Sequence, residues 1–172
     1  MSVTTEEQLA FFHAHPPSSL AGLGCAPADL PDYPFDGHGE PVNSVFSITC
    51  RCGGIFFTVH GHADEDGGGG PPITLTCDDC QSRWVVFDPR KDGHDGVHHP
   101  GLPLPAGAPV ELAMSDIEGP YEIYLRFEYP SDTLIGEASG WLPSRAPDLY
   151  SWITVVGLAE GQLDTLFEQE CA

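Results

Sequence analysis

Two closely spaced pairs of cysteines constrain this 172-residue chain more than any other feature of its sequence. Cys50 and Cys52 are separated by one residue, and Cys77 and Cys80 by two. Each pair lies beside a run of strand-forming residues, so that one compact turn can present two thiolates. Zinc prefers four such ligands in a tetrahedron, with Zn–S bonds of about 2.3 Å. The spacing therefore predicts one metal site built from all four cysteines.

The residues between the two pairs indicate how the pairs would meet. The segments "IFFTVHG" (55–61) and "ITLT" (73–76) read as strands, and the acidic, glycine-rich run over residues 63–72 reads as a mobile loop tip that joins them. An antiparallel hairpin of this kind brings its two ends, and therefore both cysteine pairs, together. Gly53 directly follows Cys52, where a chain that turns back around a metal often needs a positive φ angle.

Within this predicted module, residues 43–88, the segment from Phe46 to Asp88 resembles the zinc-ribbon group with rubredoxin-like knuckles. It departs from the ribbon pattern in two places: the first pair has one spacer residue instead of two, and Gln81 rather than glycine follows the second pair. The resemblance implies one structural Zn²⁺ per chain, because a shell of four cysteines leaves no open coordination position for chemistry. The wider chain also resembles an uncharacterised family of small bacterial proteins with a CxC…CxxC…FD core, and that resemblance implies no activity.

Other states of the cysteines stay open. Four reduced thiols without metal, a pair of disulfides, or an iron site bound by four thiolates would give the same sequence pattern. Closely spaced cysteines in a reducing compartment more often hold metal than form disulfides. The two remaining cysteines, Cys25 and Cys171, have no recognisable catalytic neighbourhood, and we expect inert thiols there.

The charge balance narrows the classes of partner. Six basic residues stand against 26 acidic ones, a net charge of −20 with histidine neutral. Such a surface disfavours nucleic acids and anionic membranes, since both are bound mainly through Lys and Arg. It suits a protein partner with a basic surface, or solubility alone.

The N-terminal segment lacks the pattern of a signal peptide, and no apolar run approaches the roughly 20 residues needed to span a bilayer, so we expect a cytoplasmic protein.

Histidines supply the alternative hypothesis, a small metal-dependent hydrolase. His60 and His62 lie two apart at a strand end, and His94, His98 and His99 share a loop with several aspartates. A histidine–carboxylate shell with an open position would support metal-assisted hydrolysis. The same residues also suit a solvated, turn-rich loop. Because the nucleophile-elbow, metalloprotease, phosphate-loop and dinucleotide motifs are all missing, we expect an acidic binding protein, of adaptor or immunity type, rather than an enzyme.

The rest of the pattern predicts a mainly β (α+β) fold in one domain over residues 1–172: an antiparallel sheet or small sandwich with an embedded four-cysteine ribbon and one or two short helices. Twenty glycines and 17 prolines argue for many turns. A short helix is expected after Thr4 or Thr5, ended by Pro16 and Pro17. Strands are expected at 43–49, 83–88 and 149–157.

The portion over residues 108–172 contains the clearest alternation. Residues 110–115 and 121–129 alternate between apolar and polar, with turn residues between them, which predicts an antiparallel hairpin with one buried face. The buried positions of its second strand would be Tyr121, Ile123, Leu125, Phe127 and Tyr129. In the last twelve residues Leu163, Leu166 and Phe167 have helical spacing, and we predict a C-terminal helix there, with a strand as the alternative.

Overall fold

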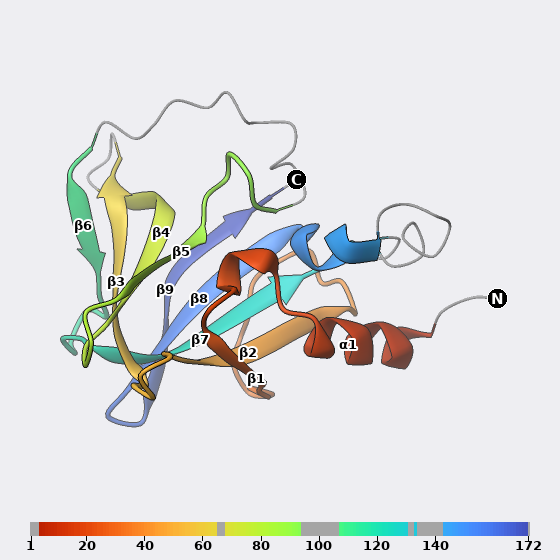
Figure 1. Cartoon of the computed structure of the whole chain (residues 1–172), viewed down its shortest axis with the longest axis horizontal. Helices are drawn as coiled ribbons and strands as arrows, with labels where there is room; N and C mark the ends of the chain where they lie inside the picture. Colours follow the sequence, from red (N-terminus) through yellow and green to blue (C-terminus); the bar gives the residue numbers. More distant parts are fainter. Residues whose placement is uncertain (1–3, 65–67, 94–106, 131–132, 134–142, 172) are drawn as a thin grey trace.

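The computed structural model describes residues 4–64, 68–93, 107–130, 133 and 143–171. Within these residues nine strands form a single antiparallel sheet that curls into a half-barrel (Figure 1). The predicted mainly β fold is confirmed. The helices are α1 (Thr5–Ala14), η1 (Ser18–Leu20) and η2 (Pro143–Asp148), and the strands are β1 (Gly24–Pro27), β2 (Asn43–Thr49), β3 (Phe56–Ala63), β4 (Gly69–Cys77), β5 (Arg83–Phe87), β6 (Pro109–Leu112), β7 (Tyr121–Glu128), β8 (Trp152–Ala159) and β9 (Gln162–Glu170).

Helix α1 begins after Thr4, one of the two N-cap residues expected from the sequence, and its start is stabilised by a capping box. The Thr4 hydroxyl accepts a hydrogen bond from the Glu7 amide at 3.1 Å, and the Glu7 carboxylate accepts one from the Thr4 amide at 2.8 Å. The buried Phe12 ring stacks on Tyr129 with 3.7 Å between ring centroids, which holds the helix against the core. Of the helices in the described ranges, none has the length and apolar character that crossing a membrane requires.

At the centre of the sheet, β2 and β3 lie one after the other along the same edge of β7. β2 pairs with β7 up to Ser47 opposite Tyr124, and β3 then continues along the same side of β7, with Phe56 opposite Glu122. Further along, β3 leaves β7 and pairs with β6. Residues 50–55 therefore protrude as a turn between two segments of one long, interrupted strand.

The predicted hairpin of residues 110–115 with 121–129 is wrong. Both of its strands exist, but β6 pairs with β3, and β7 pairs with β2, β3 and β8. Alternation fixes which face of a strand is buried, but not which strand lies beside it. The buried face is accordingly confirmed, since all five side chains predicted for it are buried: Tyr121, Ile123, Leu125, Phe127 and Tyr129.

The predicted C-terminal helix is also wrong, because these residues form β9, which pairs with β8. The register shifts at Val155 and Val156: Phe167 lies opposite Val155, while Thr165 lies opposite Val156. The residue between them, Leu166, is an extra residue in β9, that is, a β-bulge. A bulge breaks the period of two, so its apolar residues take a spacing that resembles a helix.

The glycine-rich run is not only a loop tip. Gly69 to Pro72 belong to β4, with Gly69 opposite Ala63. A Cβ on Gly69 would lie 2.1 Å from a methyl group of Leu112, so the Leu112 side chain packs directly over the backbone at this position. Residues 65–67 lie outside the described residues.

The outer face of β7, β8 and β9 is covered by an irregular segment, residues 28–42, which we call the strap. The Tyr33 hydroxyl hydrogen-bonds with the Thr165 hydroxyl on β9. The Phe35 ring lies 4.7 Å from the guanidinium carbon of Arg126 on β7. The strap thus packs against strands that the alternating pattern marks as half exposed.

Candidate metal centre

The first cysteine turn, residues 50–54, interrupts the passage from β2 to β3. The Cys50 amide donates to the Gly54 carbonyl at 2.8 Å, and the Gly53 amide donates to the Cys50 carbonyl at 2.9 Å. Gly53 has a φ angle of +91°, which confirms the conformation expected from the sequence. This tight turn brings the side chains of Cys50 and Cys52 to one side.

The second turn, residues 77–82, joins β4 to β5 in a similar way. The Cys77 amide donates to the Ser82 carbonyl at 2.9 Å, and the Gln81 amide donates to the Cys77 carbonyl at 2.9 Å. Gln81 takes the left-handed conformation, with φ of +62°, where a ribbon knuckle usually has glycine. Its side-chain amide donates to the Asp78 carbonyl at 2.9 Å, which compensates for part of the backbone strain.

The two turns bring all four sulfur atoms together. Every Sγ lies within 4.8 Å of the others, with 3.5 Å between Cys50 and Cys80 and 3.6 Å between Cys52 and Cys77. A tetrahedral ion with metal–sulfur bonds of about 2.3 Å requires sulfur atoms about 3.8 Å apart. The geometry therefore fits four thiolates around one ion, and all four cysteines are free thiols rather than disulfides.

Gly54 is required beside the sulfur atoms, and the sequence analysis did not single it out. A Cβ at this position would lie 2.9 Å from Cys77 Sγ and 3.3 Å from Cys52 Sγ. The Gly54 amide also donates to Cys52 Sγ at 3.4 Å, as amides do around thiolate-bound metals. Two consecutive glycines directly after a cysteine are the signal that would have identified it.

The environment of the thiols differs from one turn to the other. Hydrogen bonds with the Ser82 hydroxyl and, to a smaller extent, the Ser82 amide lower the pKa of the Cys80 thiol to about 6. The Cys80 Sγ lies 3.3 Å from the Ser82 hydroxyl oxygen. Burial raises the pKa of the Cys50 thiol to about 12. Of the two thiols Cys80 is thus the more easily ionised, and binding of a cation favours the loss of the proton from Cys50.

The histidines predicted as a second metal site are not gathered into one within the described residues. The four cysteines form the one group of three or more metal-ligating side chains found there, so His60 and His62 lack a third ligand among those residues. The His62 ring nitrogen Nδ1 instead lies 3.2 Å from the Gly107 carbonyl oxygen. His94, His98 and His99 lie outside the described residues.

The two remaining cysteines lie away from this cluster. Cys25 is half buried in β1, and Cys171 is buried after β9. Burial raises the pKa of Cys25 to about 11, so its thiol is protonated at neutral pH, in keeping with the inert thiol predicted there.

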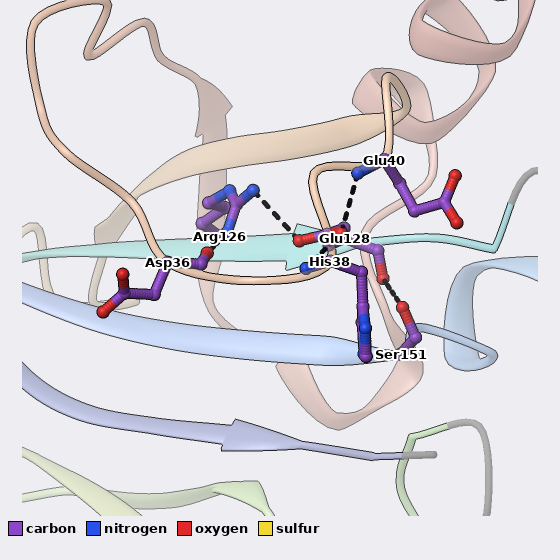
Figure 2. Close-up of polar contacts among 6 residues, drawn as sticks. All are labelled: Asp36, His38, Glu40, Arg126, Glu128 and Ser151. Atoms are coloured by element: carbon purple, nitrogen blue, oxygen red, sulfur yellow. Dashed lines mark hydrogen bonds and ion pairs between the residues drawn. The ribbon is translucent and has the colours of Figure 1, made fainter.

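A second polar cluster lies beneath the strap, at Glu128 (Figure 2). One carboxylate oxygen of Glu128 accepts hydrogen bonds from the His38 and Glu40 amides, both at 2.9 Å. The other accepts from Arg126 Nη2 at 3.2 Å, and Arg126 Nη1 donates to the Asp36 carbonyl at 2.7 Å. We call this cluster the clasp, because it ties the strap to β7. The alternating pattern assigned Arg126 and Glu128 to the polar face and gave no sign that both are buried.

Comparison with known proteins does not assign this chain to a family. No protein-family model matches the chain, and neither a curated protein nor a solved structure shows significant similarity to it. The resemblance to a zinc ribbon is therefore supported only by the cysteines and by the geometry of their two turns. What the structure defines is a cluster of four cysteines that can bind a metal ion.

The backbone at Gln81 provides a first prediction. Replacing Gln81 with valine should destabilise the metal-loaded protein by about 1–2 kcal/mol, because a β-branched residue disfavours a positive φ angle. Gln81→Gly and Gln81→Asn should stay close to the wild type, since both residues tolerate this conformation. Chemical denaturation of the three variants measures the difference. Equal midpoints for Gln81→Val and Gln81→Gly would contradict the left-handed turn.

Proposed function

We propose that this protein is an acidic binding protein, stabilised by one structural zinc ion, whose partner is a protein with a basic surface. The observation that carries the proposal is the imbalance of exposed charge. Among the described residues the exposed basic side chains are Arg51, Arg83 and Lys91, while the exposed acidic ones are Glu6, Glu7, Asp29, Asp32, Asp36, Asp64, Asp78, Asp79, Glu111, Asp116, Glu118, Glu160, Glu168 and Glu170. A surface of this kind steers cationic partners towards it and repels nucleic acids.

Zinc fits the donor set better than the harder divalent ions, since four thiolates around one ion are typical of zinc or iron. A complete shell of four thiolates leaves no position for a substrate or a water, which supports a role in folding rather than catalysis. With all four cysteines ionised, the ion and its ligands carry a net charge of about −2. The centre would thus add to the negative field that attracts a basic partner.

The experiment that tests this function has two parts. Metal analysis of protein purified without added metal should give one zinc per chain, whereas a second metal with hydrolytic activity would favour the hydrolase hypothesis instead. Cross-linking in the cells that make the protein should then recover a basic partner. Its affinity, measured by calorimetry, should fall steeply between about 0.05 M and about 0.5 M salt, because exposed charges are screened over that range. A partner whose affinity does not change with salt would contradict recognition by charge.

A further inference from the structure

Two large apolar side chains are exposed at the join between the first cysteine turn and β3. Ile55 is 40% exposed and Phe56 is 44% exposed, whereas the next residue, Phe57, is fully buried. Among the described residues one other large hydrophobic is exposed to this extent, Val85 on β5 at 44%. Single exposed hydrophobics are common, but two in succession, directly after a tightly hydrogen-bonded turn, form a patch that the core does not need.

Carboxylates lie on both sides of this patch. Glu122 on β7 is the direct partner of Phe56 in the sheet. On the other side the Asp78 amide donates to the Phe56 carbonyl at 2.9 Å, which places Asp78 opposite Phe56 as well. Asp79 follows, with a carboxylate oxygen that would lie 2.8 Å from a Cβ on Gly54. Phe56 is therefore flanked in the sheet by two acidic residues, Glu122 and Asp78, and a third, Asp79, lies beside Gly54, next to Ile55 in the chain.

The carboxylates of these three residues are available to a partner. Within the described part of the chain, none of Asp78, Asp79 and Glu122 forms an ion pair. The basic side chain of the first turn itself, Arg51, is directed towards Gly22, since its Nη2 atom would lie 3.9 Å from a Cβ there. Figure 1 also shows α1 at the opposite end of the molecule from β3, β4 and β6.

We propose that Ile55, Phe56, Asp78, Asp79 and Glu122 form the docking surface for an arginine side chain of the basic partner, an inference that rests on the function proposed above. A guanidinium stacks on an aromatic ring while its N–H groups reach carboxylates beside the ring. Lysine matches this arrangement less well, because its ammonium is a compact, strongly hydrated charge without a planar face. A cluster of thiolates around a divalent ion next to Asp78 strengthens the attraction.

The test uses the metal-loaded full chain and two short peptides. One peptide has arginine at alternate positions, and the other has citrulline, which is uncharged, at the same positions. Binding is measured by fluorescence anisotropy, and the contact surface is mapped by ¹⁵N–¹H correlation spectra. The arginine peptide should bind and shift the signals around Phe56, and the citrulline peptide should not. Phe56→Ser should weaken binding about fivefold, the scale of one exposed cation–π contact, and Glu122→Gln should weaken it about threefold.

Matched controls separate this surface from charge in general. Val85→Ser removes an equally exposed apolar side chain elsewhere in the sheet, and Glu6→Gln removes an exposed carboxylate on α1; both should bind like the wild type. Metal content and melting temperature confirm that each variant is folded. If the arginine peptide binds but Phe56→Ser does not weaken it, the docking surface is overturned and the proposed function stands. If the arginine peptide does not bind, the proposed function fails as well, and equal binding of the citrulline peptide would overturn recognition of arginine.

Discussion

Removing the metal should destabilise this protein by at least about 4 kcal/mol, which is the linkage expected for a site saturated 1,000-fold above its Kd. A metal held by the four cysteines would join the turn between β2 and β3 to the turn between β4 and β5, and so would tie together two parts of the sheet that are distant in sequence. For a chain of this length, such a loss corresponds to a fall in melting temperature of about 10 °C or more. Thermal denaturation with and without a strong chelator measures it, and equal melting temperatures would contradict a structural metal.

The cysteine variants should reproduce the effect of the chelator. Cys77→Ser removes a fully buried ligand, so it should lose the metal and melt like the chelated wild type. Cys25→Ser is the matched control, because Cys25 lies outside the cluster and should keep one metal per chain. A thiol count adds an independent reading: two titratable thiols in the metal-loaded protein and six in the denatured, metal-free protein.

The cysteine cluster is the part of the molecule that the sequence predicts best. Cys50, Cys52, Cys77 and Cys80 are found together because a thiolate site depends on short local spacings, which a sequence displays directly. The positive φ angle at Gly53 is predictable for the same reason. Glycine is required at position 54 because the second turn, which is distant in sequence, packs against it. A local sequence pattern does not show such a long-range contact.

The wrong predictions concern which strands pair with one another, the bulge in β9, and the burial of polar residues by the strap. The buried apolar face of β7 was predicted correctly. The alternation in β7 gives its buried face correctly, but pairing with β3 and β8 instead of β6 depends on how the whole sheet closes. In β9 one extra residue, Leu166, produces the spacing of a helix inside a strand. Arg126 and Glu128 have the ordinary alternation of an exposed face, and they are buried by a strap that has no periodicity of its own. Long-range packing decides all three features.

Replacing Glu128 with glutamine should cost about 3–5 kcal/mol, the penalty for breaking one partner of a buried ion pair. Glu128 is 0% exposed and Arg126 is 6% exposed, so neither charge can be compensated by water. Glutamine keeps the shape of the side chain but removes the negative charge that lies beside Arg126. Its NH₂ group would also face groups that donate hydrogen bonds to Glu128: either the His38 and Glu40 amides or Arg126. The expected fall in melting temperature is about 10 °C, and the amide signals of His38 and Glu40 should shift most, since both donate to Glu128.

Glu170→Gln is the matched control for this experiment. Glu170 Oε1 lies 3.2 Å from His38 Nε2, so it also joins the strap to the sheet, but its side chain is half exposed. An exposed pair of this kind contributes less than about 1 kcal/mol, and the variant should melt close to the wild type. If Glu128→Gln were no more destabilising than Glu170→Gln, the strap would be held by Tyr33 and Phe35 rather than by the clasp. A larger loss for Glu128→Gln alone identifies a single buried carboxylate as the group that fixes the strap on the outer face of the half-barrel.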